Sequence, residues 1–302
     1  MLPEAKALQL IAVYYYVSEQ FETELHYSVQ RFSNNTTPSF TDVEVMTLYL
    51  FVMQQEQRFD NKHIYTFARH YLLTWFPRLP SYQAFNHRLN RLCCAFQVLT
   101  ARLLQQFQPV DTSTRLSLID SMPIQTCSGK RKGRVAKELT DKGYCSTKGK
   151  YYYGLKLHVL GLQRRGTVPF AEHIALSAAS ENDLNILEQN WSTLQERIFI
   201  GDKIYHDRPL HQQLWHQQKS SVLTPVKKVK NKAAVLVQHD QAADDLFSKA
   251  VSSLRQPIES LFNWLIEKTN LQNASKVRSA NGLLVHVFAR LAAAYSYLIF
   301  NS

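Results

Sequence analysis

The spacing of apolar residues changes close to residue 110, and no other feature of the sequence constrains the fold as strongly. Before this point apolar side chains recur every three or four residues, which is typical of helices that bury one face. After it, short apolar runs with strand-like composition alternate with helical segments. The sequence therefore predicts an all-helical N-terminal domain, residues 1–110, and a second domain, residues 111–302, with a mixed α/β sheet flanked by helices.

Local signals locate two helices in the first domain. Thr41 and Glu44 have the spacing of a capping box, in which each side chain accepts a hydrogen bond from the other residue's backbone, so a helix is expected to begin there. After a turn that ends at Pro80, apolar residues at helical spacing predict one long helix that includes Phe85 and Leu103.

The polar face of this long helix carries Arg88 and Arg91. A helix that follows a turn and has basic residues in its early turns can enter a groove of DNA. An ordinary helix of a bundle, with its polar face in water, has the same pattern. Both arginines are therefore candidate DNA contacts, and their spacing does not decide between the two interpretations.

Five apolar runs after residue 110 predict strands. They are Leu116–Asp120, Tyr151–Leu162, Val168–Ser177, Arg197–Asp202 and Ser221–Thr224. Four helices are expected between and after them, over residues 181–191, 209–219, 256–269 and 280–299. Pro257 suits the first turn of the third helix, because the N–H that proline lacks has no partner there.

Two of these strands end in an aspartate, Asp120 and Asp202, and Glu259 lies on the helix expected from residue 256. If the two strands are neighbours, their carboxylates lie side by side and repel each other unless a proton or a cation intervenes. Oxygen ligands without a Cys or His cluster favour Mg²⁺ or Mn²⁺. A third acid packed across the strand ends would complete a site for two such ions, which can cleave a phosphodiester.

Spacing alone does not establish this triad. A single aspartate at the end of a strand is more often a turn or cap residue. Asp183, Asp207 and Glu267 are further acids that the same argument does not exclude.

The formal net charge of +11 is concentrated in the second domain. Residues 1–110 hold nine basic and eight acidic residues, whereas residues 130–150 alone hold eight basic and two acidic ones. The basic residues at the start of this segment are Lys130, Arg131, Lys132 and Arg134, and a second basic group is Lys227, Lys228, Lys230 and Lys232. Such blocks suit a polyphosphate partner, because each neutralised phosphate releases counterions. A solvated loop kept soluble by its charge is the alternative.

Composition excludes several classes of protein. With 45% hydrophobic residues the chain can bury a core, so it is not disordered throughout. The four cysteines form no C-x-x-C pair, so neither a structural zinc nor a disulfide framework is indicated. The most apolar stretch contains His286 and Arg290, so an amphipathic helix is expected there and no membrane span. The segment Gly129–Gly133 is not a phosphate-binding loop, so no nucleotide cofactor is expected.

Four short segments, in this order, resemble a DDE-type transposase of bacterial insertion sequences. They are Leu118–Pro123, Tyr153–His158, Phe199–Tyr205 and Arg255–Phe262. The chain resembles the insertion-sequence 982 group in particular, through Phe76–Asn90 and through Val277–Ser279. The resemblance implies an RNase H-like catalytic core in the second domain.

This resemblance also assigns roles to individual positions. Asp120, Asp202 and Glu259 match the three metal-binding acids, and the implied cofactor is Mg²⁺ or Mn²⁺, as two ions. Lys156 and His158 would face the substrate, although ordinary strand residues with side chains in water fit their positions equally well.

Arg255 matches an arginine that would contact the DNA backbone or steady the glutamate four residues later. Relatives in the wider superfamily often have a tyrosine three residues before this arginine and a lysine seven residues after the glutamate. Here Ser252 and Ile266 stand at those places. This departure weakens the case for a DNA hairpin intermediate and leaves the acidic triad unaffected.

The implied reaction is hydrolysis of a phosphodiester at the transposon end, followed by attack of the freed 3′-hydroxyl on target DNA. The expected partners are double-stranded DNA, as terminal inverted repeats and target, and further copies of the chain in a homodimer or larger assembly. The N-terminal domain is expected to bind the DNA ends, in the cytoplasm and at the nucleoid. Two alternatives remain, an RNase H-like nuclease that cuts without joining and a catalytically inert DNA-binding protein.

Overall fold

The computed structural model describes residues 2–31, 38–110, 113–146, 148–164, 166–227 and 234–300. Contacts divide the chain into two compact units. The helical unit comprises Met1–Phe107, Arg134–Glu138 and Leu265–Ser302, and the sheet unit comprises Gln108–Gly133 and Leu139–Trp264. The last helix thus belongs by its contacts to the helical unit.

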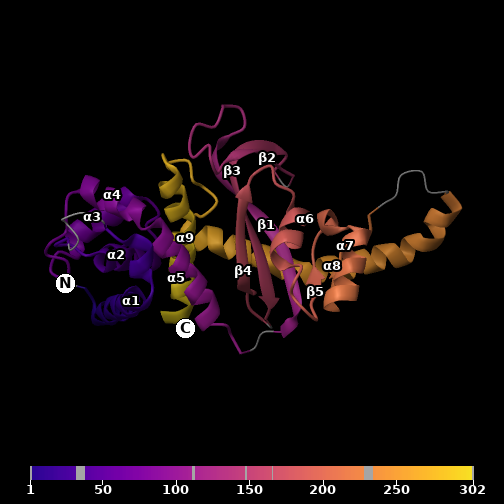
Figure 1. The fold of residues 1–302 in the computed structure, drawn as a ribbon, viewed down its shortest axis with the longest axis horizontal. Coiled ribbons are helices and arrows are strands. Elements are labelled where there is room, and N and C mark those ends of the chain that lie inside the picture. Colours follow the sequence, from indigo (N-terminus) through magenta and orange to yellow (C-terminus); the bar gives the residue numbers. More distant parts are fainter. Residues whose placement is uncertain are drawn as a thin grey trace. The chain divides into compact units, whose positions relative to one another are not determined.

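The helical unit consists of α-helices with one short 3₁₀ helix (Figure 1). They are α1 (Glu4–Thr23), η1 (Leu25–Val29), α2 (Asp42–Glu56), α3 (Asn61–Tyr71), α4 (Tyr82–Arg91), α5 (Cys93–Gln106) and α9 (Ala280–Phe300). Helix α2 begins as predicted, because both hydrogen bonds of the capping box between Thr41 and Glu44 are present.

Helix α9 packs against α5 and α2 and supplies much of the core of this unit. Among the described residues it is the one helix long and apolar enough to cross a membrane, judged by length and composition. However, 72% of its most apolar window is buried inside the protein. That is the burial expected of a core helix.

The single helix predicted through Phe85 and Leu103 is in fact two helices, so this prediction was wrong. Leu92 separates α4 from α5, because its ψ of 13° is not helical and its N–H donates to the carbonyl of Leu89, only three residues back. Leu89, Leu92 and Phe96 are all buried. The apolar spacing continues across the break, and for this reason the spacing could not reveal it.

The sheet unit contains a six-stranded mixed sheet. Its strands are β1 (Ser113–Ser128), β2 (Asp141–Cys145), β3 (Lys150–Gln163), β4 (Phe170–Ala178), β5 (Ile198–Ile200) and β6 (Ser221–Leu223). The strand order is β2-β3-β1-β5-β6, with β4 also paired to β3. Strand β3 is antiparallel to β1, β2 and β4, whereas β5 is parallel to β1 and β6. Strand β2 was not predicted, because charged residues and a glycine make up much of it.

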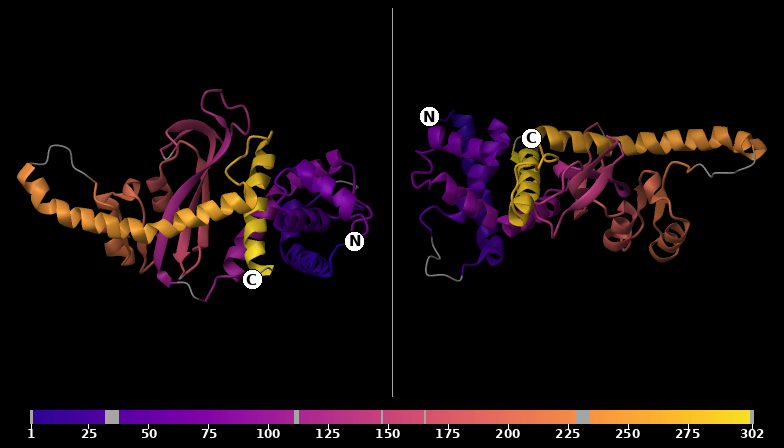
Figure 2. Two further views of the ribbon diagram at one scale, coloured as in Figure 1. Left: turned by 180° about the vertical axis from the view of Figure 1, so that it is seen from behind. Right: turned by 90° about the horizontal axis from the view of Figure 1, so that it is seen from above.

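Helices cover both faces of this sheet (Figure 2). They are α6 (Asp183–Ile186) with the π-turn η2 (Leu187–Trp191), the 3₁₀ turn η3 (Lys203–Tyr205), α7 (Arg208–Gln218) and α8 (Ala234–Thr269), whose last turn falls in the helical unit. On one face, Ile119 and Leu160 join a buried cluster with Trp191 and Leu210. On the other face α8 packs closely, since a Cβ at Gly161 would lie 3.8 Å from Cδ1 of its Ile258.

Two boundaries differ from the predictions. Strand β1 continues beyond Asp120, because its pairing with β3 extends to Ser128 although its other neighbour, β5, stops at Ile200. Asp120 therefore lies within a strand and not at its end. Helix α8 begins at Ala234, so Pro257 lies inside the helix, where its missing N–H removes one backbone hydrogen bond.

The predicted class is confirmed, since the unit is a mixed α/β fold with helices on both faces of the sheet, beside a separate helical region. This architecture agrees with the expected RNase H-like core.

Candidate active site

Asp120 lies on β1, and Asp202 follows the neighbouring strand β5, two residues after its end. In the parallel pair of β1 and β5, Leu118 is the partner of Ile200, and each aspartate lies two residues further along the chain from this last pair. The prediction that these two strands are neighbours is thus confirmed. Gly201, between β5 and Asp202, leaves room for the ring of Tyr205, because a Cβ there would lie 2.5 Å from that ring.

The neighbouring backbone fixes each carboxylate. Asp120 accepts a hydrogen bond from the N–H of Ser121 at 2.8 Å. Asp202 caps the turn that follows β5, accepting from the N–H of Ile204 at 2.8 Å. Each of these bonds is local, so the neighbouring backbone contributes to the position of both acidic side chains.

Arg255 of α8 joins Asp120 to the third acid. Its Nη1 lies 2.5 Å from Oδ2 of Asp120, and its Nη2 lies 2.5 Å from Oε1 of Glu259, one helical turn later. The side chains of Asp120 and Arg255 are 18% and 19% exposed, whereas that of Glu259 is 52% exposed. The guanidinium therefore supplies the positive charge between two of the three predicted acids.

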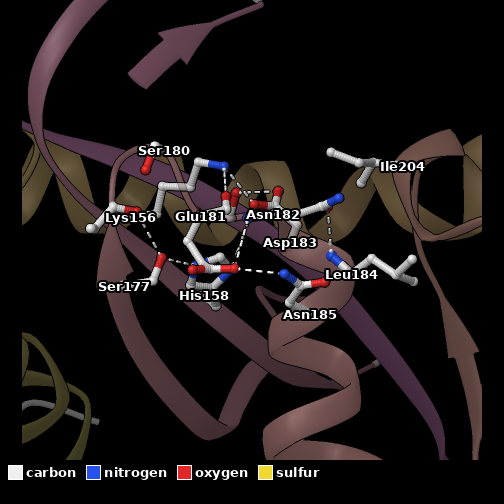
Figure 3. Close-up of polar contacts among 12 residues, drawn as sticks. Lys156, His158, Ser177, Ser180, Glu181, Asn182, Asp183, Leu184, Asn185 and Ile204 are labelled. Atoms are coloured by element: carbon white, nitrogen blue, oxygen red, sulfur yellow. Dashed lines mark hydrogen bonds and ion pairs between the residues drawn. The ribbon is translucent and has the colours of Figure 1, made fainter. Parts of the chain in front are cut away.

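The alternation of side chains along β1 places a second cluster on the opposite face of the sheet. Asp120 points toward α8, so the next residue, Ser121, points toward α6, where its hydroxyl donates to Oδ2 of Asp183 at 2.7 Å. Lys156 of β3 donates to Oδ1 of Asp183 at 2.8 Å and to the carbonyl of Glu181 at 2.7 Å. Figure 3 shows the ammonium of Lys156 beside Asp183 and the backbone of Glu181, whereas the carboxylate of Glu181 accepts from the amide of Asn185.

His158 belongs to the same cluster, and its side chain is fully buried. Its Nε2 lies 2.8 Å from the hydroxyl of Ser177, and its Nδ1 lies 3.9 Å from Asp183 (Figure 3). Burial lowers the pKa of His158 to about 4 despite the nearby carboxylate, so the imidazole is neutral near pH 7. In contrast with the prediction, His158 lies too deep in this structure to reach a DNA strand.

Burial and the surrounding charges change the pKa of Asp120. Burial is the main cause that raises its pKa, from the usual 3.8 to about 7. Asp202 and Asp183 raise it further through like-charge repulsion, while Arg255 and the N–H of Ser121 lower it. Asp120 is therefore close enough to both other aspartates to be affected by their charge.

The predicted DNA contacts outside this cluster have different surroundings. Lys130, Arg131 and Lys132 in the sheet unit are exposed, and so are Arg134 and Arg91 in the helical unit. Lys228, Lys230 and Lys232 lie outside the described residues.

Arg88 differs from these exposed residues. Its side chain is 13% exposed and lies 2.8 Å from Asp42, which also accepts from Arg31 at 2.5 Å. Because the guanidinium already has a carboxylate partner and little access to solvent, this placement does not favour the predicted DNA contact.

The sequence prediction missed Asp183 as a member of the site. It named this residue only as one of three acids that spacing did not exclude. Of the other two, Asp207 caps α7 and Glu267 is 74% exposed. What distinguishes Asp183 from these two acids is its contact with Ser121. Asp120 and Ser121 are consecutive strand residues, so they present polar groups to opposite faces of the sheet, and Asp183 is the partner on the second face.

Comparison with known proteins adds an independent finding. No curated protein and no solved structure match the chain. Residues 111–296, well over half of the chain, match the family described as transposase DDE domain. The chain therefore belongs to the transposase DDE domain family.

Proposed function

We propose that the chain is a transposase of the insertion-sequence 982 group that cuts DNA at transposon ends and joins the freed ends to target DNA. Its family consists of enzymes that act on DNA. The observation that carries the proposal is the placement of Asp120 on β1 and of Asp202 just after the parallel neighbour β5, with Arg255 linking Asp120 to Glu259.

The donor set fits the divalent metal that the family generally uses. Among the described residues no three His, Cys, Asp or Glu side chains are grouped closely enough to hold a metal ion. However, the guanidinium of Arg255 already places a positive charge between Asp120 and Glu259. Carboxylate oxygens are also the ligands that Mg²⁺ and Mn²⁺ prefer. Asp120, Asp202 and Glu259 would hold two such ions. Glu259 could take part only after the guanidinium of Arg255 moves away from its place between Asp120 and Glu259.

When bound, the ions would activate the attacking oxygen and stabilise the leaving oxygen of the phosphodiester. The side chains supply charge and position. A guanidinium released from Asp120 can form two parallel hydrogen bonds to a phosphate, which is a role for Arg255. On the other face of β1, Asp183 fixes Ser121 and thereby the backbone that donates to Asp120.

DNA contacts in this proposal come from both units. In the sheet unit the exposed Lys130, Arg131 and Lys132 attract the phosphate backbone. In the helical unit, which we propose binds the transposon ends, Arg91 is the exposed arginine of α4. Two DNA ends must be handled together, so we propose that the chain acts as a dimer or larger assembly on DNA in the bacterial cytoplasm.

The test uses a plasmid that carries the DNA flanking this gene on both sides. Purified protein with Mg²⁺ is expected to cut at the transposon ends and to give joined products with a second, unrelated plasmid. Glu259→Gln should abolish cutting and leave DNA binding intact, whereas the matched control Glu267→Gln, an exposed acid two turns further along α8, should cut normally.

The products distinguish the proposal from its alternatives. Cutting without joined products would identify a nuclease, and DNA binding without any cutting would identify an inert DNA-binding protein. Normal cutting by the Glu259→Gln variant would refute the assignment of the site.

A further inference from the structure

A cavity of about 460 Å³ lies entirely within the helical unit. The start of α3, one face of α4, the segment before α9 and the first turns of α9 enclose it. Its volume falls in the range of roughly 300–1,000 Å³ that small-molecule sites occupy. None of the residues assigned above to the catalytic site lines it.

Two segments that are distant in the sequence meet at this cavity. Both were noted above for their resemblance to the insertion-sequence 982 group, and neither has a part in the proposed chemistry. The first contributes Tyr82, Asn86 and Asn90, and the second contributes Val277, Arg278 and Ser279.

Arg290 lines the cavity and carries a positive charge that is only partly compensated. It is 6% exposed, and although the charge of Asp60 acts on it, among the described residues no carboxylate forms an ion pair with it. Its Nη1 donates to the carbonyl of Thr269, the last residue of α8, and its Nη2 donates to that of Phe59 at 2.6 Å. A helix C-terminus offers only about half an elementary negative charge, so an anion in the cavity would stabilise this guanidinium.

The rim adds more positive charge than negative charge. Lys62, Lys276 and Arg278 are exposed cations that line the cavity, and Asp60 is the one acid among its lining residues. Asp60 lies 2.6 Å from the ammonium of Lys276 and so neutralises one of these three cations. The remaining charge selects an anionic ligand.

Neutral polar groups on one wall suit a heterocyclic base. The side-chain amides of Asn86 and Asn90 line the cavity, and Asn86 also accepts from Asn61 at 2.8 Å. Asparagine amides can donate to and accept from the edge of a base, and the ring of Tyr82 offers a surface for stacking. Lining cations beside amides and a phenol suit the phosphate and the base of a nucleotide.

We propose that this cavity binds a single nucleotide, with its phosphate against the cations and its base against the asparagines and Tyr82. The proposal rests on the proposed function, in which the source is an unpaired nucleotide at a DNA end. A free nucleotide has the same chemistry, and the experiment separates the two sources.

The experiment measures fluorescence anisotropy of labelled DNA in EDTA, where no cleavage occurs. One duplex is blunt, and the other has three unpaired nucleotides at one end. A stacked base adds to the binding free energy, so the protein is expected to bind the frayed duplex about tenfold more tightly than the blunt one.

Variants at the cavity should remove this preference without affecting blunt DNA. Lys62→Gln acts on the phosphate and Asn90→Ala on the base, and each is expected to bring the two affinities within about twofold. The matched control is Arg69→Gln, an exposed cation of the same helix, α3, that does not line the cavity. Arg290→Met is a deeper change that can unfold the helical unit, so the proposal is decided by the other two variants.

A second titration with a deoxynucleoside monophosphate distinguishes the sources. A preference for frayed DNA supports binding of a nucleotide within a strand. Binding of the free nucleotide that Lys62→Gln and Asn90→Ala weaken, without that preference, supports a free ligand in the same cavity. Equal affinity for both duplexes and no binding of the free nucleotide would overturn the cavity assignment, whereas failure to bind even blunt DNA would refute the proposed function.

Discussion

Replacing Asp120 by asparagine is expected to stabilise the sheet unit at pH 8 and to have no such effect at pH 4. Asparagine has the shape of a protonated aspartate and never takes a negative charge. In the folded chain, burial and the neighbouring Asp202 and Asp183 raise the pKa of Asp120 to about 7, whereas an unfolded chain loses this proton near 3.8. The folded state therefore holds the proton over a range of pH in which the unfolded state has released it.

The size and sign of the effect follow from this difference. Below pH 3.8 both states are protonated, so the charge of Asp120 has no effect on stability. Between 3.8 and about 7 the penalty grows, and above that it is complete, at 1.36 kcal/mol for each pH unit of difference, or about 4 kcal/mol. Because the side chain of Asp120 is 18% exposed, solvent screens part of this penalty, and about 4 kcal/mol is its upper limit.

Urea unfolding in EDTA at pH 4, 6 and 8 measures the effect. Tryptophan fluorescence reports chiefly on the sheet unit, because Trp191, Trp215 and Trp264 lie there and Trp75 alone lies elsewhere. The matched control is Asp245→Asn, an exposed aspartate of α8 in the same unit. Equal stabilities of wild type and Asp120→Asn at pH 8, or the same difference at pH 4 as at pH 8, would refute the reasoning.

Three further changes test other contacts. Arg255→Gln removes charge-assisted hydrogen bonds that a metal ion must displace, so Mn²⁺ should bind roughly tenfold more tightly by electron paramagnetic resonance; unchanged affinity would contradict this. Asp183→Asn should slow DNA cleavage roughly 10- to 100-fold at unchanged DNA affinity, and a normal rate would exclude a positioning role. Asp42→Asn leaves Arg31 and Arg88 without their carboxylate and should cost the helical unit about 3 kcal/mol in urea unfolding, against no loss if the contacts are incidental.

The fold was predictable where apolar residues alone decide the local structure. Strand β3 pairs on both sides along its length and is almost continuously buried, so its apolar run located it well. The second half of β1 could not be predicted in this way, because polar residues from Ser121 to Ser128 interrupt the pattern there. Their strand conformation comes from pairing with β3, which is a long-range contact that no window of sequence contains.

The start of α8 was hidden for a different reason. Pro257 is favourable in a first helical turn and unfavourable in the interior, so the local preference placed the start of the helix too late. Packing of Ile258 and Leu261, both fully buried, holds the helix on the sheet through this position. Tertiary contact thus outweighs the local cost of the proline, and that balance is not visible in the sequence.

The candidate site was predictable on one face of the sheet and not on the other. Asp120 and Asp202 each follow an apolar run, and parallel neighbours bring such residues level, so two acids could be located without coordinates. Asp183 is the first residue of α6, where an acid is common in any helix, so its position in the sequence does not mark it. What distinguishes it is that Ser121, which follows Asp120, must point to the opposite face and needs a partner for its hydroxyl there. In a sheet of this kind, a polar residue directly after the catalytic aspartate, such as Ser121, therefore indicates that a partner residue lies on the opposite face. The slowed cleavage expected of Asp183→Asn tests that inference directly.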